Sequence, residues 1–214
     1  DFSSNLLSVT NRIFLIYFSL SVLIFFLFLI SGIRIFDSLN MAMSISSSGG
    51  FLPTNSLNDI IRNNFQSIVL CLSFLLSILN FYFLYNLLIE RDNLKKHSED
   101  LFLIGLIFTF SIIFYFLNDL NLSYVFINVI SSIGNSGLSM GSVPENFGLY
   151  FILLTLFGGS VLSVTSGLKF LRIYILIKGF FMEIYRLVKP NLVLNTKIMF
   201  SENKINSDNI KISF

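Results

Sequence analysis

Two short segments rich in serine and glycine could supply the backbone oxygen atoms that bind a cation. The first is Ser-Ile-Ser-Ser-Ser-Gly-Gly-Phe-Leu at residues 44–52, and the second is Ser-Ser-Ile-Gly-Asn-Ser-Gly-Leu-Ser at residues 131–139. Each follows a long apolar run and a short helix-like stretch, and each precedes another apolar run. Polar backbone at membrane depth is tolerated only where it is buried in protein or lines an aqueous cavity. A re-entrant pore loop meets this condition, so cation conduction is the leading hypothesis.

The chemistry of such a loop is coordination by backbone carbonyl groups, which replace the hydration shell of an entering ion. Glycine permits dihedral angles that turn successive carbonyl groups toward one axis. The short helices end at the loops, so their negative dipole ends face a cation, and neither loop carries an acidic residue. Anion selectivity is therefore disfavoured. The predicted cation-binding residues are Ser48, Gly49, Gly50, Phe51, Asn135, Ser136, Gly137 and Leu138.

The composition indicates a membrane protein and argues against other classes. Hydrophobic residues make up 54% of the chain, charged residues 12%, and the mean hydropathy is +0.80, whereas soluble domains have about 25% charged residues. The net charge of +2 is too small to indicate a nucleic-acid partner. With one cysteine and one histidine, no catalytic or metal-binding constellation can be assembled. We predict no enzyme activity and no bound cofactor.

The apolar runs predict a repeated helical architecture. Four runs are long enough for a span of about twenty residues: residues 13–32, 65–89, 101–117 and 148–177. Two shorter stretches precede the polar loops: residues 37–46, with Asp37 as the N-cap, and residues 121–133. The order of span, short helix, loop and span thus occurs twice, at a period of about ninety residues. Each loop alone would read as a flexible linker, but two loops in matching positions favour pores.

This order predicts an all-α membrane protein of two membrane–pore loop–membrane repeats. The predicted boundaries are 10–90 for the first repeat, 91–100 for a cytoplasmic loop, 101–189 for the second repeat and 190–214 for a cytoplasmic tail. Lysine and arginine are concentrated in the central loop and after residue 177. The positive-inside tendency therefore places the central loop and the tail in the cytoplasm and both polar loops outside.

The residues resemble the Trk/Ktr/HKT superfamily of potassium transporters, and most closely the bacterial Trk-type membrane subunit. The resemblance is carried by Ser-Ser-Gly-Gly-Phe at residues 47–51 and Asn-Ser-Gly at 135–137, both similar to filter sequences of that family. It is also carried by Phe-Gly-Gly-Ser at 157–160 and Thr-Ser-Gly-Leu-Lys at 165–169, followed by Arg172. Each filter alone is a weak signal, but together with these later motifs they are specific. The resemblance covers about residues 10 to 190.

Subunits of that family carry four such units around one pathway. This chain holds two, which resemble units three and four, so we expect the C-terminal half of a subunit whose N-terminal half precedes Asp1. The resemblance implies potassium uptake across the cytoplasmic membrane, a homodimer surrounded by membrane lipid, and a cytoplasmic nucleotide-binding regulatory subunit. Glycine in both visible filters favours K⁺ over Na⁺.

Two positions are implied by the resemblance to act in gating. In relatives, a glycine-containing segment breaks the second helix of the third unit and forms an intramembrane gate. The corresponding residues 73–85 have no glycine, so either Ser77 and Asn80 form an irregular turn or the helix is continuous. Lys169 matches a basic residue that faces the pathway. If residues 148–177 form one helix, Lys169 lies about 31 Å from Gly148, where it could instead snorkel to the headgroups, as we expect for Arg172.

Two alternatives remain at this point. A potassium-binding subunit of a P-type ATPase complex shares the four-unit plan, although the Gly-Gly-Ser stretch and the basic residues of the last helix fit the Trk type better. A structural or assembly membrane protein would use the two loops as simple connectors.

Overall fold

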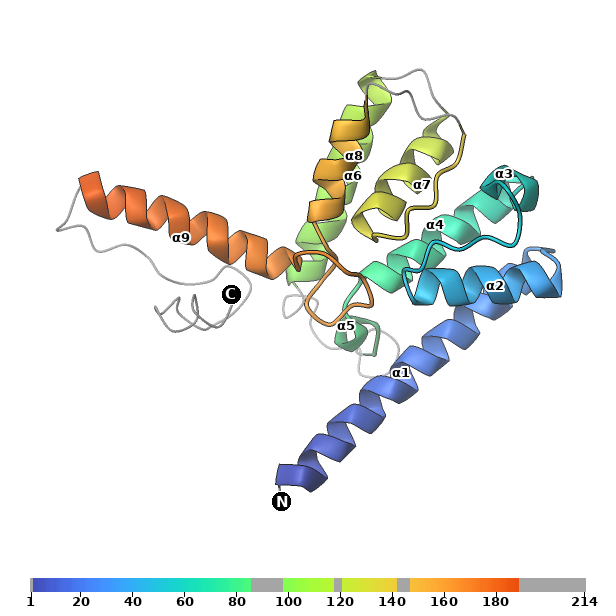
Figure 1. The fold of residues 1–214 in the computed structure, drawn as a ribbon, viewed down its shortest axis with the longest axis horizontal. Helices are drawn as coiled ribbons and strands as arrows, with labels where there is room; N and C mark the ends of the chain where they lie inside the picture. Colours follow the sequence, from blue (N-terminus) through green and yellow to red (C-terminus); the bar gives the residue numbers. More distant parts are fainter. Residues whose placement is uncertain (1, 86–97, 118–120, 142–146, 189–214) are drawn as a thin grey trace.

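The structure is a computed structural model, and it describes residues 2–85, 98–117, 121–141 and 147–188. The elements in these ranges are α-helices, as the composition predicts (Figure 1). They are α1 (Phe2–Ile30), α2 (Ile35–Ser46), α3 (Leu57–Ile60), α4 (Asn64–Ile78), α5 (Phe81–Tyr85), α6 (Ser98–Leu117), α7 (Leu122–Ile133), α8 (Gly148–Leu156) and α9 (Phe170–Val188).

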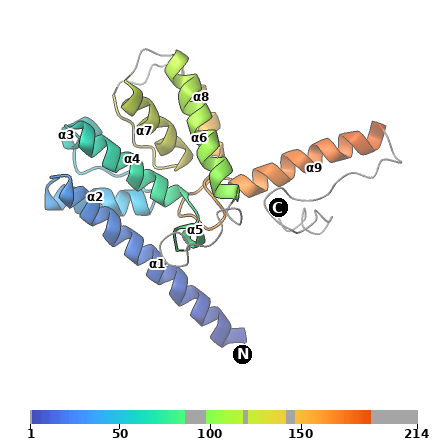
Figure 2. The same cartoon turned by 180° about the vertical axis from the view of Figure 1, so that it is seen from behind.

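The helices form two groups with the same internal order. In the first group α1 packs against α2 and α4, and in the second α7 packs against α6 and α8. Contacts between α4 and α7 join the groups (Figures 1 and 2). One core of buried apolar side chains runs through both, with Phe28, Phe74 and Phe114 among its largest fully buried members. The predicted repetition of long helix, short helix, loop and second helix is therefore present.

The first helix of each group is suited to cross a membrane. Within the described ranges, residues Thr10–Ile30 and Glu99–Leu117 are the two stretches long and apolar enough to do so, with mean hydropathies of 2.9 and 2.2. Both agree with the first and third predicted spans. Of the loop predicted at 91–100, residues 98–100 form the first turn of α6, and residues 91–97 lie outside the described part.

The short helices before the loops are also present, with one correction. The helix predicted from residue 121 is α7, with Asn121 as its N-cap residue. The helix predicted to begin at Asp37 begins two residues earlier, and Arg34 is the N-cap residue of α2. Asp37 instead lies in the first helical turn, where its negative charge still interacts favourably with the helix dipole.

The second and fourth predicted spans are wrong as continuous helices. The stretch predicted as 65–89 is interrupted after Ile78, because Leu79 adopts extended backbone angles (φ −73°, ψ 157°), and α5 begins at Phe81. The stretch predicted as 148–177 ends as a helix at Leu156, and residues 157–169 are non-helical before α9 begins. We call residues 157–169 the α8–α9 segment. From this segment α9 runs away from the other helices (Figures 1 and 2).

Aromatic side chains hold α8 against α6 above this interruption. The hydroxyl group of Tyr150 donates to the backbone oxygen of Phe110 at 2.7 Å. The ring of Phe114 stacks on Tyr150 and meets Phe151 edge-to-face, with centroids 5.5 and 5.1 Å apart. These contacts fix the short α8 although it has only nine residues.

Candidate functional site: two loops and the interrupted helix below them

The second loop (residues 134–139) continues directly from the C-terminus of α7. After the C-cap Gly134, Asn135 adopts a left-handed conformation with φ 53°. The N–H of Asn135 donates to the oxygen of Ser132 at 3.1 Å, and the N–H of Ser136 donates to the oxygen of Ser131 at 3.1 Å. This pair of bonds is a Schellman motif, which satisfies carbonyl groups of the last helical turn.

The first loop (residues 47–52) repeats this geometry at the C-terminus of α2. Ser48 follows the C-cap and has φ 52°. Its N–H donates to the oxygen of Ile45 at 3.2 Å, and the N–H of Gly49 donates to the oxygen of Ser44 at 2.8 Å. Gly50 and Gly137 then occupy matching positions, with φ angles of 70° and 67°. The two loops therefore share one backbone conformation. From the sequence, only their similar composition and position were apparent.

The two loops also touch one another. A Cβ atom on Gly50 would collide with the backbone carbonyl oxygen of Ser136. In contrast, no described atom lies within 4 Å of the position that a Cβ on Gly137 would occupy. Gly49 and Gly137 are exposed, and Phe51 is 81% exposed. The predicted ion-binding residues of the two loops are thus neighbours, and one side of them is open.

Polar side chains of α7 hold the second loop in place. Asn128, which is buried, donates from Nδ2 to the oxygen of Met140 at 3.0 Å and accepts from the N–H of Met140 at 2.8 Å. The hydroxyl of Ser131 donates to the carbonyl oxygen of Leu138 and lies 2.9 Å from the hydroxyl of Ser136. The sequence analysis did not single out Asn128 or Ser131 as functional residues. The sequence feature that could have indicated these two residues is their spacing, since they are polar residues three positions apart on an otherwise apolar helix face.

The first loop has a different kind of support. Ser44 occupies the position in α2 that Ser131 occupies in α7. Its hydroxyl oxygen is buried and, among the described residues, has no hydrogen-bond partner, and the same holds for the hydroxyl oxygen of Ser48. Buried polar atoms are normally paired. These two oxygen atoms are therefore available for a group that the described residues do not supply.

The α8–α9 segment satisfies its own polar groups in place of a helix. The N–H of Gly159 donates to Oγ1 of Thr165 at 2.8 Å, and the hydroxyl of Ser163 donates to the oxygen of Ser160 at 2.7 Å. A parallel bridge joins Phe157 and Leu168. Serine and threonine hydroxyl groups compete with helical hydrogen bonding in this way. Non-helical backbone at membrane depth requires such internal partners.

Lys169 lies at the end of this segment, and its predicted position 31 Å along a continuous helix is wrong. Its ammonium group donates to the backbone oxygens of Ser163 and Thr165 at 3.0 and 2.6 Å and to the hydroxyl of Ser163 at 3.2 Å. The ammonium group is therefore folded onto the segment. Arg172 lies in the first turn of α9.

The α8–α9 segment, which belongs to the second repeat, contacts both the second loop and the first repeat. The side-chain amide of Asn135, in the second loop, donates to the backbone oxygen of Ser166 at 3.1 Å. On its other side, the N–H of Ser160 donates to the oxygen of Ile78 at 3.1 Å, at the interruption between α4 and α5. Asn80, which the sequence analysis proposed for an irregular turn, lies within that interruption. The irregular turn is thus present, and the continuous helix is excluded.

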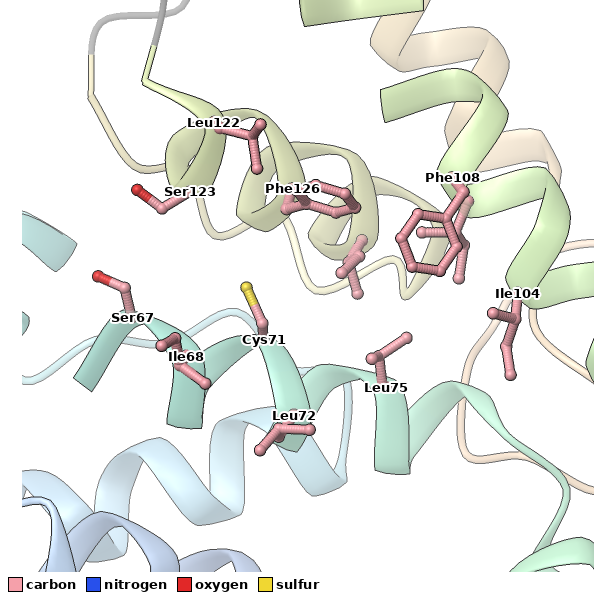
Figure 3. Close-up of a pocket in the computed structure, with 12 residues that line it drawn as sticks. Ser67, Ile68, Cys71, Leu72, Leu75, Ile104, Phe108, Leu122, Ser123 and Phe126 are labelled. Carbon is pink, nitrogen blue, oxygen red and sulfur yellow. The ribbon is translucent and has the colours of Figure 1, made fainter. Parts of the chain in front are cut away.

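An apolar cavity of about 340 Å³ lies apart from these groups, between α4, α6 and α7 (Figure 3). Its lining includes Cys71, Leu75, Phe108 and Phe126, and the hydroxyl-bearing Ser67 and Ser123 lie together toward one end. None of the predicted ion-binding residues lines this cavity. Apart from the two serine hydroxyl groups at one end, the lining is apolar and offers no oxygen ligands for a cation, so the loops remain the candidate site.

Comparison with known proteins supports the resemblance drawn from the loops. No protein-family model matches the chain. The chain is 26% identical over 200 residues to a Trk system potassium uptake protein TrkH of Halomonas elongata, and this match covers 86% of the chain and 41% of that protein. It is 27% identical over 208 residues to the Trk system potassium uptake protein TrkG of Escherichia coli, covering 90% of the chain and 42% of that protein.

A solved structure gives the same result for the fold. The crystal structure of the potassium transporter TrkH from Vibrio parahaemolyticus superposes with a TM-score of 0.76 at 18% identity, over 96% of this chain and 47% of that one. The predicted all-α membrane fold is therefore confirmed, and so is the resemblance to Trk-type transporters. The chain spans about two fifths of the length of the curated relatives it matches.

The position of the glycine-containing interruption refines the comparison between repeats. The resemblance implies such an interruption for the third unit of the family, and the sequence analysis sought it in residues 73–85. The structure has an interruption there, but the glycine-containing one is the α8–α9 segment, with Gly158, Gly159 and Gly167. The second repeat therefore contains the glycine-containing interruption, whereas the interruption of the first repeat contains no glycine.

Proposed function

We propose that this chain, a relative of the Trk-type potassium transporters, contributes two of the four quadrants of a potassium-conducting pore. The first and second loops would act as filter segments whose carbonyl groups bind the ion. The remaining quadrants would come from the rest of the same subunit, because the chain spans about two fifths of its relatives. The whole protein would take up K⁺ across the cytoplasmic membrane, with both loops facing outside.

The observation that carries this proposal is the shared backbone conformation of the two loops. Both continue a Schellman motif into a left-handed residue, and both place a glycine with φ near +70° two positions later. A simple connector has no reason to reproduce these angles in both repeats. A filter built from repeated units does, because each quadrant must present its carbonyl groups to the same axis.

The surroundings of the loops suit a cation. Helices α2 and α7 both end at their loops, so the partial negative charge of each helix C-terminus lies beside the proposed site. The carbonyl oxygen of Leu138 accepts from Ser131, and a carbonyl oxygen has a second lone pair with which it can still bind an ion. The exposed faces of Gly49 and Gly137 would meet the other quadrants.

The α8–α9 segment would act as the gate below the filter. It is non-helical, it contacts the second loop through Asn135 and Ser166, and it ends at the cationic Lys169. A positive charge near a cation pathway raises the barrier to passage. Movement of the segment, or of Lys169 alone, would therefore change the conductance. By resemblance, we further propose that the subunit forms a homodimer and that a cytoplasmic nucleotide-binding subunit regulates this gate.

The test is potassium uptake in uptake-deficient cells at low external K⁺. The cells would express the full-length parent protein, as wild type or with Gly50→Ser or Gly137→Ser. We expect wild type to restore growth, and both variants to lose uptake or to admit more Na⁺ relative to K⁺ at equal amounts of protein in the membrane.

Cells that express Gly105→Ala serve as the matched control, because Gly105 lies within α6 and no described atom lies within 4 Å of its Cβ position. Uptake that both loop substitutions leave unchanged in rate and selectivity would contradict the filter assignment and favour the connector alternative.

A further inference from the structure

The interruption between α4 and α5 frees backbone groups that a continuous helix would pair. In an uninterrupted helix each N–H donates to the oxygen four residues earlier. The N–H of Leu79 still does so, to Leu75 at 3.1 Å, but the next two N–H groups, of Asn80 and Phe81, turn away from the helix. The oxygens of Ser77 and Ile78 are released at the same point. Buried backbone groups of this kind need partners elsewhere.

The α8–α9 segment supplies most of these partners, from about eighty residues further along the chain. The N–H of Ser160 donates to the oxygen of Ile78 at 3.1 Å, and the N–H of Val164 donates to the oxygen of Ser77 at 3.3 Å. The oxygen of Leu162 accepts from the N–H of Phe81 at 3.0 Å. A Cβ atom on Gly159 would lie 2.6 Å from the oxygen of Ile78, so the close approach depends on glycine.

Two neighbouring carboxylates at the start of α6 complete the arrangement. Asp100, with 1% of its surface exposed, accepts from the N–H of Asn80 at 3.0 Å. Glu99 accepts from the N–H of Val161 at 3.2 Å. One carboxylate thus binds the interruption of the first repeat and the other binds the α8–α9 segment of the second. A buried carboxylate is retained only where it is hydrogen-bonded.

We propose that Asp100 and Glu99 are positioning residues that join the two interruptions into one block, so that residues 79–81 and the α8–α9 segment move together. This inference builds on the proposed function, because it assigns the gate a second half in the first repeat. The backbone bonds between Ile78, Phe81 and the segment keep the two halves in register. The carboxylates attach both halves to α6, which packs on α7 and so connects the block to the second loop.

The first test is amide hydrogen exchange on the full-length parent protein in lipid nanodiscs. In Asp100→Ala the N–H of Asn80 loses its acceptor. We expect exchange in peptides covering residues 79–84 and 158–164 to accelerate by a similar factor, about tenfold or more. Asp100→Asn retains an oxygen acceptor and should stay close to wild type. Glu183→Ala, which removes an exposed ion pair with Arg186 (3.1 Å), is the control and should change neither peptide.

Acceleration confined to residues 79–84 would overturn the proposal, because the two interruptions would then open independently. This readout does not depend on transport. Hydrogen exchange can therefore contradict the proposal that the two interruptions move together even if the proposed function is correct. If the proposed function is wrong, the wild-type protein will take up no K⁺.

The second test leaves both carboxylates in place. Phe81→Cys and Leu162→Cys would be combined in a cysteine-free background, since these two residues are joined by the 3.0 Å backbone bond. If the two interruptions move as one block, oxidation should cross-link the pair and leave K⁺ uptake within about twofold of the reduced protein. In the cross-linked protein, a block of uptake that a reductant reverses would overturn the proposal. Each single cysteine variant, treated with the oxidant, is the control.

Discussion

The backbone carbonyl of Ser136 occupies the space beside Gly50 where any other residue would place its Cβ atom. The two loops, which are far apart in the sequence, therefore pack backbone against backbone. Gly50 is required for two reasons, its left-handed φ and this contact, whereas Gly137 is required for its φ alone. The repeats match in backbone conformation but not in their tolerance of substitution.

This asymmetry predicts that alanine at the two glycines has unequal effects. A left-handed conformation costs a residue other than glycine about 1–2 kcal/mol, and this cost applies to both Gly50→Ala and Gly137→Ala. Gly50→Ala must in addition displace the carbonyl of Ser136. We expect at least about tenfold loss of K⁺ uptake for Gly50→Ala, equivalent to about 1.4 kcal/mol, and a smaller loss for Gly137→Ala. Equal losses in rubidium or potassium flux assays would contradict the asymmetry.

Asn128 is predicted to be the main support of the second loop. Asn128→Leu leaves the buried N–H and oxygen of Met140 without their side-chain partners, at a cost of about 1–3 kcal/mol for each unsatisfied group. We expect a lower melting temperature of the purified protein together with reduced uptake. Asn40→Leu is the control, because Asn40 is not buried and, among the described residues, its side chain bonds within its own helix, to Phe36 at 2.7 Å. If Asn128→Leu has the melting temperature of the wild type, the second loop does not depend on the two hydrogen bonds between Asn128 and Met140.

The matching serines of the two short helices should respond in opposite ways. Ser131→Ala removes bonds to Leu138 and Ser136 and should destabilise the second loop by about 1–3 kcal/mol. Ser44→Ala removes a buried hydroxyl with no partner among the described residues, so it should be neutral or slightly stabilising. Thermal unfolding of the two variants, measured side by side, tests this. A larger loss for Ser44→Ala would mean that another part of the full-length protein, or a bound ion, uses its hydroxyl.

Removal of the charge at Lys169 is predicted to increase conduction. The ammonium group bonds to three oxygen atoms of the α8–α9 segment. In the proposed pore its positive charge would oppose the entry of a cation. We expect Lys169→Gln to raise the maximal rate of K⁺ uptake by about fivefold, equivalent to about 1 kcal/mol, whereas Lys169→Arg keeps the charge and should remain near wild type. A lower rate in Lys169→Gln, at equal protein amounts, would show instead that the bonds of Lys169 hold the segment in its conducting form.

Much of the fold follows from local patterns along the chain. The apolar runs placed α1 and α6 because about twenty consecutive apolar residues satisfy the length of a membrane span, and the serine- and glycine-rich loops marked the ends of α2 and α7. The interruptions could not be read in the same way. Residues 73–80 contain no glycine, whereas residues 157–169 contain three, so the two interruptions share no local sequence pattern. The backbone groups that pair across them lie about eighty residues apart in the chain.

The helical membrane class, the two repeats and the identity of the loop residues could therefore be predicted, because each depends on hydropathy, spacing and local turn preferences. The contacts between distant residues could not be predicted, such as the carbonyl of Ser136 at Gly50 and Asp100 at Asn80. The contact of Asp100 satisfies a backbone N–H released by a broken helix, and the contact at Gly50 joins the two loops. The partners in these contacts are set by how the repeats pack, which no local pattern encodes.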